Sequence, residues 1–173
     1  MVKIEQKLDL VCIGRSSVDL YGEQVGGRLE DMASFAKYVG GSPTNISIGS
    51  SRLGLKTALI TKVGDEHMGR FIIEQLEREK EDISRVKIDP ERLTALVLLG
   101  IRNQHQFPLI FFRENCADMA IMPEDISQDF IASSKATLVT GTHFSKTNVS
   151  EASFLAMKYA KDAGRSVVFD IDY

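Results

Sequence analysis

The segment around a glycine pair has the residue types of a small-ligand site. Gly40 and Gly41 precede Pro43, and Asn45 follows within the first turn of a predicted helix. Glycines allow close approach of the backbone to a ligand, and a helix N-terminus presents free N–H groups to an electronegative group. The Asn45 side chain offers a donor and an acceptor, which suits a sugar hydroxyl. The alternative interpretation is a tight turn that merely starts a helix.

A second candidate is Asp19, which comes shortly after the first predicted strand and the segment 14–18. At the carboxyl edge of an open parallel sheet, a carboxylate can accept hydrogen bonds from two adjacent hydroxyls. A turn or capping aspartate is the alternative. The two candidates strengthen each other, because one ligand could bridge Asp19 and Asn45.

Other chemical motifs find no support in the sequence. Residues 49–57 come within one residue of a P-loop, but Leu55 takes the lysine position and Gly49 falls inside a predicted helix. No GxGxxG motif follows a strand, so a dinucleotide site of that type is not predicted. The three histidines have no partners at metal-ligand intervals, and we therefore predict no metal site.

Composition limits the class of protein. The 173 residues, 43% hydrophobic and 26% charged, favour one domain with a sizeable core rather than a disordered tail. With 21 basic and 24 acidic residues the net charge is -3, which predicts neither a nucleic-acid nor a membrane partner. No apolar run is long enough to span a membrane or to match a signal peptide. Cys12 and Cys116 lie far apart in apolar stretches, so we expect a reducing, cytoplasmic location.

Short apolar runs alternate with helical patterns along the chain. This alternation predicts an α/β fold with a central, mostly parallel sheet flanked by helices. Asp65 is predicted to cap the second helix. The predicted strands cover 8–13, 57–63, 137–140 and 166–171, and the predicted helices cover 43–53, 65–79 and 151–163.

Two stretches, near residues 20–28 and 93–113, interrupt the alternation. The second contains two apolar runs and predicts a hairpin. Such strands can form a lid over the carboxyl ends of the parallel strands, where α/β folds bind ligands. A hairpin that simply extends the edge of the sheet is the alternative.

Residues 41–64 resemble the first signature of the ribokinase-like (PfkB) carbohydrate kinases, with the glycine pair, Asn45, Ser47, Gly54 and Gly64 at that family's intervals. Segment 14–19 also resembles the family's first-strand motif, which ends in a sugar-binding aspartate. The resemblance implies a ribokinase-like fold with a small antiparallel β lid. It also implies a sugar site that contains Ser17, Asp19, Gly40, Gly41 and Asn45.

Residues 108–120 are similar to the branch of the family that phosphorylates keto-deoxy sugar acids, especially 5-dehydro-2-deoxy-D-gluconate in myo-inositol breakdown. A sugar acid carries a carboxylate, for which a planar guanidinium is a bidentate partner. The resemblance implies that Arg113 binds this carboxylate, with Arg102, expected on the preceding strand, as a weaker candidate. A surface salt bridge is the alternative for Arg113.

Related kinases are about twice as long, and their nucleotide site, anion hole and catalytic-base aspartate lie in a second half. We therefore expect residues 1–173 to be the N-terminal part of a single sugar-kinase domain, inactive in isolation. The predicted strand 166–171 leads into an arginine-containing loop in this branch, and that loop is absent from the sequence.

For the whole enzyme, the resemblance implies transfer of the γ-phosphoryl of ATP to the terminal hydroxyl of 5-dehydro-2-deoxy-D-gluconate. It implies ATP and magnesium as cofactors, and a homodimer formed through the lid. Kinases of 2-keto-3-deoxygluconate or fructose are the alternatives within the family. A non-catalytic sugar-binding module is the alternative of another class.

Overall fold

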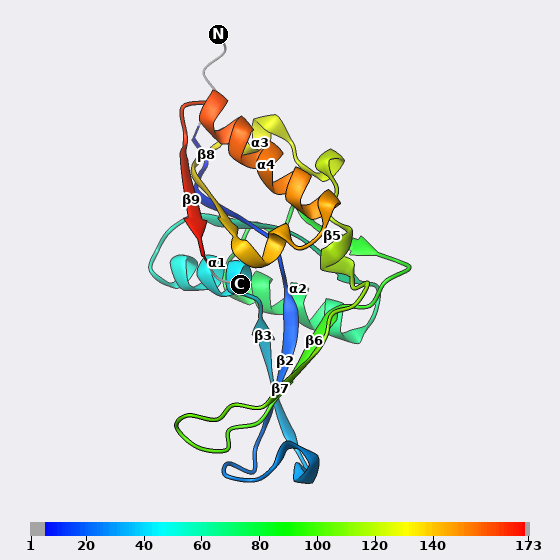
Figure 1. The fold of residues 1–173 in the computed structure, drawn as a ribbon. Coiled ribbons are helices and arrows are strands. Elements are labelled where there is room, and N and C mark those ends of the chain that lie inside the picture. Colours follow the sequence, from blue (N-terminus) through cyan, green and yellow to red (C-terminus); the bar gives the residue numbers. More distant parts are fainter. Residues whose placement is uncertain (1–5, 172–173) are drawn as a thin grey trace.

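The computed structural model describes residues 6–171, which form two sheets and the helices that cover the larger one (Figure 1). The large sheet has five parallel strands in the order β5-β4-β1-β8-β9. This arrangement confirms the mostly parallel sheet that the alternation of strands and helices predicts. Its strands are β1 (Leu8–Ile13), β4 (Thr57–Gly64), β5 (Val86–Asp89), β8 (Ser134–Thr140) and β9 (Ser166–Asp170).

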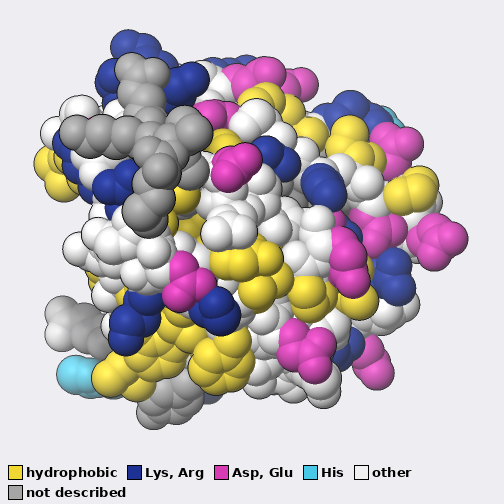
Figure 2. Space-filling view, turned by 90° about the horizontal axis from the view of Figure 1, so that it is seen from above, with side chains coloured by type: hydrophobic (Ala, Val, Ile, Leu, Met, Phe, Trp, Pro, Cys, Tyr) yellow, Lys and Arg dark blue, Asp and Glu magenta, His cyan; other side chains and the backbone are white. Residues whose placement is uncertain are grey.

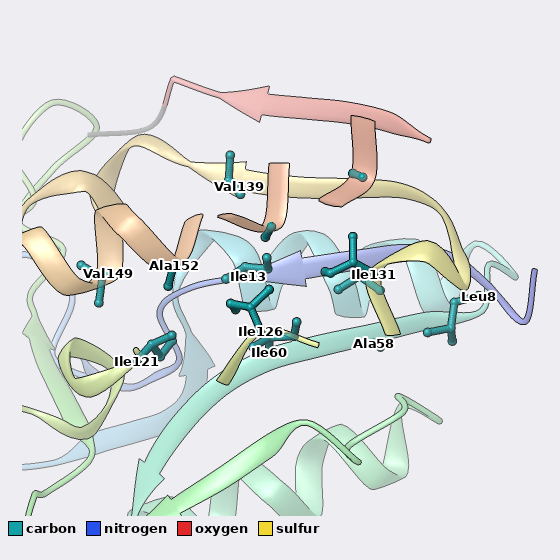
Figure 3. Close-up of a cluster of buried hydrophobic side chains, with 13 residues drawn as sticks. Leu8, Ile13, Ala58, Ile60, Ile121, Ile126, Ile131, Val139, Val149 and Ala152 are labelled. Carbon is teal, nitrogen blue, oxygen red and sulfur yellow. The ribbon is translucent and has the colours of Figure 1, made fainter. Parts of the chain in front are cut away.

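Helices cover both faces of the large sheet, α1 and α2 on one face and α3 and α4 on the other (Figure 1). Successive side chains of a strand point to opposite faces. Val11 and Ile13 of β1 therefore pack in a cluster with residues of α3 and α4, shown in Figure 3. Leu10 and Cys12 pack in a second cluster with residues of α1 and α2. The helices are α1 (Ser42–Arg52), α2 (His67–Arg78), α3 (Gln128–Ala132) and α4 (Thr147–Asp162).

The start of α2 differs from the prediction. Its cap is Glu66 and not Asp65, since the Glu66 carboxylate accepts hydrogen bonds from the backbone N–H groups of Met68 (2.6 Å) and Gly69 (3.1 Å). The same carboxylate also accepts from the backbone N–H of Thr94 at 3.2 Å, which ties the helix to the chain that enters the small sheet. One acidic side chain therefore serves both the helix and its tertiary contact.

The small sheet contains four strands in the order β3-β2-β6-β7. It is mixed, because β2 and β6 run parallel while the two outer pairs are antiparallel. The reason is that β2 follows β1 and β6 follows β5, and these two parallel strands end at the same edge of the large sheet. Its strands are β2 (Ser17–Gly22), β3 (Phe35–Gly40), β6 (Ala95–Leu99) and β7 (Leu109–Phe112).

The limits of the small sheet also differ from the expected segments. The strand expected near 20–28 begins at Ser17 and ends at Gly22, and β3 is not among the predicted elements. Arg102 follows β6 in the loop toward β7 and does not lie on a strand. The 3-10 helices lie at Leu29–Asp31, Ala117–Ala120, Pro123–Asp125 and Gly141–Phe144.

The surface is of mixed character. On the face shown in Figure 2, Lys and Arg side chains are interspersed with Asp and Glu side chains, and apolar side chains gather in its lower part. No helix within residues 6–171 combines the length and apolar character needed to cross a membrane. Both cysteines, Cys12 and Cys116, are buried and are not joined in a disulfide.

Candidate functional site

Two neighbouring hollows lie where the small sheet meets the carboxyl ends of the large sheet. We name the first, of about 670 Å³, the lid hollow, and the second, of about 560 Å³, the edge hollow. Asp19 and Asn45 line both. The lid hollow is also lined by Tyr21, Gly22, Glu23, Ala36, Tyr38, Val39 and Ile101, and the edge hollow by Arg15, Gly41, Ser42, Ile46 and Asp170.

Asp19 lies in the middle of β2, one strand beyond the edge of the large sheet where the sequence places it. Its Oδ1 accepts a hydrogen bond from the Ser17 hydroxyl at 3.0 Å. Burial raises the pKa of Asp19, and this hydrogen bond and the charge of Arg15 oppose that rise. Ser17 itself is fully buried, so in this structure it orients the carboxylate that borders the hollows.

Gly40 and Gly41 leave room for the Asp19 carboxylate and the Arg15 carbonyl because neither glycine has a Cβ. A Cβ on Gly40 would overlap the Asp19 carboxylate, so its absence allows that carboxylate to lie against β3. Gly41 adopts a φ of 100°, which disfavours any other residue, and a Cβ there would overlap the Arg15 carbonyl. The pair therefore shapes the site through the space it leaves.

Asn45 lies in the first turn of α1 and is exposed to the hollows. Three contacts fix this end of the helix. The Thr44 hydroxyl donates to the Arg15 carbonyl at 2.9 Å, and the Ser42 hydroxyl donates to Asp170 Oδ2 at 3.2 Å. Pro43 packs against Gly14, where an added Cβ would come within 2.7 Å of Pro43 Cγ. These contacts bring the Asn45 amide to the same hollows as the Asp19 carboxylate.

The two arginines singled out in the sequence lie outside both hollows. Arg113 Nε donates a hydrogen bond to Asp118 Oδ2 at 2.9 Å, and Arg113 Nη2 lies 2.7 Å from the same oxygen in an ion pair whose Asp118 side chain is fully buried. Arg102 is exposed in the loop after β6, and its backbone N–H donates to the Gln106 carbonyl at 3.0 Å. The binding of a ligand carboxylate by Arg113 or Arg102 stays a prediction.

A buried histidine lies beneath the connection between β1 and β2. His143 is fully buried, and a Cβ on Gly14 would lie 3.2 Å from its Nδ1. Burial, and then the nearby charges of Arg113 and Arg15, lower the pKa of His143 to about 3. The imidazole is therefore neutral at physiological pH, and within residues 6–171 neither ring nitrogen has a hydrogen-bond partner.

Several lining residues were missed in the sequence. Tyr21 and Tyr38 pack edge to face with ring centroids 5.3 Å apart and border the lid hollow. The sequence did not indicate Tyr38 as a site residue, because strand β3 was not predicted. Arg15 and Asp170 border the edge hollow. Both could have been chosen from their positions at strand ends. Arg15 follows the glycine directly after β1, and Asp170 is the last residue of β9.

Residues 6–171 contain neither a P-loop nor a cluster of metal-ligating side chains. Gly49 and the residues up to Arg52 belong to α1, so their backbone N–H groups cannot form the phosphate cradle of a P-loop. Within residues 6–171 no group of three or more His, Cys, Asp or Glu side chains could hold a metal ion. The chemistry that these residues support is recognition of a polar ligand through a carboxylate, an amide and an aromatic pair.

Comparison with known proteins agrees with this geometry. The family model described as "pfkB family carbohydrate kinase" matches residues 7–173. A 5-dehydro-2-deoxygluconokinase of Geobacillus kaustophilus is 40% identical over 170 residues, which is 98% of this chain and 51% of that protein. The chain thus spans about half the length of the curated relatives it matches.

Solved structures show the same fold. A PfkB protein from Polaromonas superposes with a TM-score of 0.89 at 28% identity, over 96% of this chain and 56% of that one. A sugar kinase of Pyrococcus horikoshii, solved in complex with ATP, superposes with a TM-score of 0.86 at 26% identity, over 95% of this chain and 53% of that one. With the family model covering nearly its whole length, the chain belongs to the pfkB family of carbohydrate kinases.

Proposed function

We propose that the protein containing this chain is an ATP-dependent kinase of 5-dehydro-2-deoxy-D-gluconate that phosphorylates the terminal hydroxyl in myo-inositol catabolism. Residues 6–171 supply its sugar site and its lid. The observation that carries the proposal is that Asp19 and Asn45 line the same two hollows. The name and 40% identity of the Geobacillus kaustophilus relative support the choice of substrate.

The sugar would be held by hydrogen bonds from two directions. The Asp19 carboxylate accepts from sugar hydroxyls, and the Asn45 amide accepts from one hydroxyl while donating to another. Gly40 and Gly41 leave room for the Asp19 carboxylate and the Arg15 carbonyl, respectively. The edges and faces of Tyr21 and Tyr38 supply the apolar contact that the C–H surfaces of a sugar need.

The small sheet would act as a lid over this sugar. Asp19 lies on β2 of that sheet, and Asn45 lies on α1 beside the large sheet. A sugar that binds both residues therefore holds the lid against the body of the protein. Closure removes water from the reacting phosphoryl group, which limits wasteful hydrolysis of ATP.

We assign ATP, magnesium and the catalytic base to a part of the protein outside this chain. The assignment is supported by the lack of a metal-holding cluster within residues 6–171 and by the length of the relatives, of which this chain covers about half. ATP supplies the phosphoryl group when bound. The role of the present residues is to bind and orient the sugar hydroxyl and to exclude water.

The experiment is an Asp19→Ala substitution in the full-length protein. The kcat/KM for the sugar should fall by about 100-fold or more, because a half-buried carboxylate that accepts two hydrogen bonds from the substrate is lost. The affinity for ATP should stay within about twofold of wild type, which isothermal titration calorimetry measures. Unchanged KM and kcat for the sugar would refute the assignment of Asp19. Turnover of fructose without turnover of 5-dehydro-2-deoxy-D-gluconate would refute the proposed choice of substrate.

We also propose that the protein forms a homodimer through the lid and works in the cytoplasm. All four residues of the edge strand β7 are exposed and apolar, and an unprotected edge strand of this kind pairs readily with another strand. Replacing Ile110 by lysine places a charge on this edge. The variant should be monomeric in size-exclusion chromatography with light scattering, and a dimer that survives the substitution contradicts this interface.

A further inference from the structure

The buried side of α1 carries three hydroxyl side chains. Thr44, Ser47 and Ser51 lie three and four residues apart, so all three project from the same side of the helix. Thr44 and Ser47 are fully buried, and Ser51 is half-buried. Apolar packing has no preferred direction, whereas a hydrogen bond does. The hydrogen bonds that these hydroxyls donate therefore restrain the rotation of α1 about its own axis.

Two of these hydroxyls reach the residues that follow α2. The Ser51 hydroxyl donates to the backbone carbonyl of Glu79 at 2.6 Å. The Ser47 hydroxyl donates to Glu81 Oε2 at 2.6 Å, and Glu81 is only 7% exposed. Ser47 therefore depends on a buried side chain, whereas the partner of Ser51 is a backbone group.

The backbone of Glu81 is held from both sides. Lys80 has a φ of 61°, and its N–H donates to the Glu77 carbonyl at 3.0 Å. The Glu81 N–H donates to the Leu76 carbonyl, also at 3.0 Å, which completes a Schellman motif at the end of α2. The N–H of Asp82 then donates to a carbonyl at the start of β4 at 2.9 Å. The carboxyl of Glu81 thus starts from a fixed point between α2 and the large sheet.

A carboxyl at this position is costly to bury. In a Schellman motif the residue at the position of Glu81 is often apolar. Burial raises the pKa of Glu81, and the Ser47 and Thr57 hydroxyls oppose that rise. The nearby charges of Glu79 and Asp82 raise it further. An apolar side chain would avoid this cost. What the carboxyl adds is a direction, because a buried polar contact can fix the orientation of one helix relative to another.

Asn45 lies on the opposite side of α1 from Ser47. Residues two apart in a helix project about 200° apart, since each residue turns the chain by about 100°. Asn45 is accordingly exposed to the hollows, while Ser47 is buried. A helical side chain ends about 5 to 6 Å from the axis, so a rotation of about 10° moves the Asn45 amide by about 1 Å. A displacement of that size is enough to spoil a binding geometry.

We propose that Glu81 is a positioning residue of the sugar site, because its hydrogen bond with Ser47 sets the rotation of α1 and thereby the direction of the Asn45 amide. This inference rests on the proposed function and adds to it a residue that lines neither hollow. Glu81 acts through Ser47 and does not contact the sugar.

The test uses Ser47→Ala, Glu81→Leu and Glu81→Gln in the full-length protein. Ser47→Ala removes the donor, and Glu81→Leu removes the acceptor while placing an apolar side chain where one is common. Both should raise the KM for 5-dehydro-2-deoxy-D-gluconate by about 10-fold and leave the KM for ATP within about twofold of wild type. The double variant should be no worse than either single variant, because both remove the same hydrogen bond. Glu81→Gln keeps an acceptor oxygen, so its sugar KM should stay within about threefold of wild type.

Ser51→Ala is the matched control. It removes a hydroxyl from the same side of α1, but from a hydrogen bond six residues beyond Asn45. It should lower the melting temperature about as much as Ser47→Ala does and leave the sugar KM within about twofold of wild type.

A second measurement reads the direction of the amide without any sugar. The NMR resonances of the Asn45 side-chain amide are assigned by their loss in Asn45→Ala. They should shift in Ser47→Ala and Glu81→Leu and stay in place in Ser51→Ala.

The outcomes separate the two proposals. If Ser47→Ala and Glu81→Leu lower the melting temperature and leave the sugar KM unchanged, Glu81 is only structural and the inference is wrong, while the proposed function stands. An equal rise of the sugar KM in Ser51→Ala or in Glu81→Gln also overturns it. If wild type does not phosphorylate the sugar acid, the proposed function fails and the Asn45 resonances alone decide, with unmoved resonances refuting the role of Glu81. Melting curves identify a Glu81→Leu protein that is unfolded, and in that case Ser47→Ala decides.

Discussion

Replacing Gly40 by alanine tests whether the Asp19 carboxylate must lie where the structure has it. Gly40 is the last residue of β3 and pairs with Ser17 of β2. Its φ lies outside the left-handed region, so the backbone tolerates alanine. The added Cβ would overlap Oδ1, Cγ and Oδ2 of Asp19 alike. To restore an ordinary contact, the carboxylate must move by about 1 Å, which is a displacement large enough to spoil a binding geometry.

The expected loss follows from that displacement. A misplacement of about 1 Å costs on the order of 100-fold in rate, equivalent to about 2.7 kcal/mol of transition-state stabilisation. We therefore expect kcat/KM for the sugar to fall about 100-fold in the Gly40→Ala variant of the full-length protein. The melting temperature should stay near that of wild type, because the group that moves is the end of a side chain and not the backbone.

Gly49→Ala is the matched control. An added Cβ at Gly49 meets open space, and the residue lies inside α1, where alanine is favoured over glycine by about 1 kcal/mol. This variant should melt at a slightly higher temperature and keep wild-type sugar kinetics, measured by ADP formation in a coupled assay. A Gly40→Ala enzyme with wild-type kcat/KM would refute the reasoning, as would an equal loss in Gly49→Ala.

Three further predictions concern pH and stability. Burial raises the pKa of Asp19, so sugar affinity should increase as pH rises through that raised value, and calorimetry across pH should find the dependence reduced in Asp19→Asn. Burial lowers the pKa of His143 to about 3, so the unfolded chain takes up a proton below about pH 6.5 that the folded protein does not. The free energy of unfolding should therefore be greatest above that pH and fall toward about pH 3. If the melting temperature of His143→Gln depends on pH as strongly as that of wild type, His143 is not the cause of this dependence. Gly69→Ala would place a Cβ on the backbone carbonyl of Gly64. The substitution should lower the free energy of unfolding, measured in urea, by about 1 to 3 kcal/mol. An unchanged midpoint of urea unfolding would contradict this clash.

The large sheet could be predicted because its central strands are buried on both faces. Such strands appear in the sequence as apolar runs, as in residues 10–13 of β1 and 58–60 of β4. Strand β3 gave no comparable signal, since only Gly40 of its six residues is buried. The parallel pairing of β2 with β6 joins segments about 78 residues apart, which no local pattern reports.

The candidate site was predictable in its residue types and not in its contacts. Asp19 and Asn45 could be chosen because a strand end and a helix start are standard positions for ligand groups. Arg113 forms an ion pair with Asp118, five residues later, and Asp118 is buried because the 3-10 helix Ala117–Ala120 packs into the protein. The sequence alone shows neither the burial nor the ion pair. The place of Arg15 depends on Thr44, 29 residues away, so its orientation could not be read from its neighbours in the sequence.

The hydrogen bond from the Thr44 hydroxyl to the Arg15 carbonyl ties the first turn of α1 to the connection between β1 and β2. The same first turn carries Asn45 and, through Thr44, fixes the direction in which the chain leaves β1 for β2. A small shift of α1 would therefore carry the Asn45 amide and the beginning of β2 in the same direction. Substitutions in the core beneath this helix can thus adjust where a sugar lies relative to the rest of the enzyme.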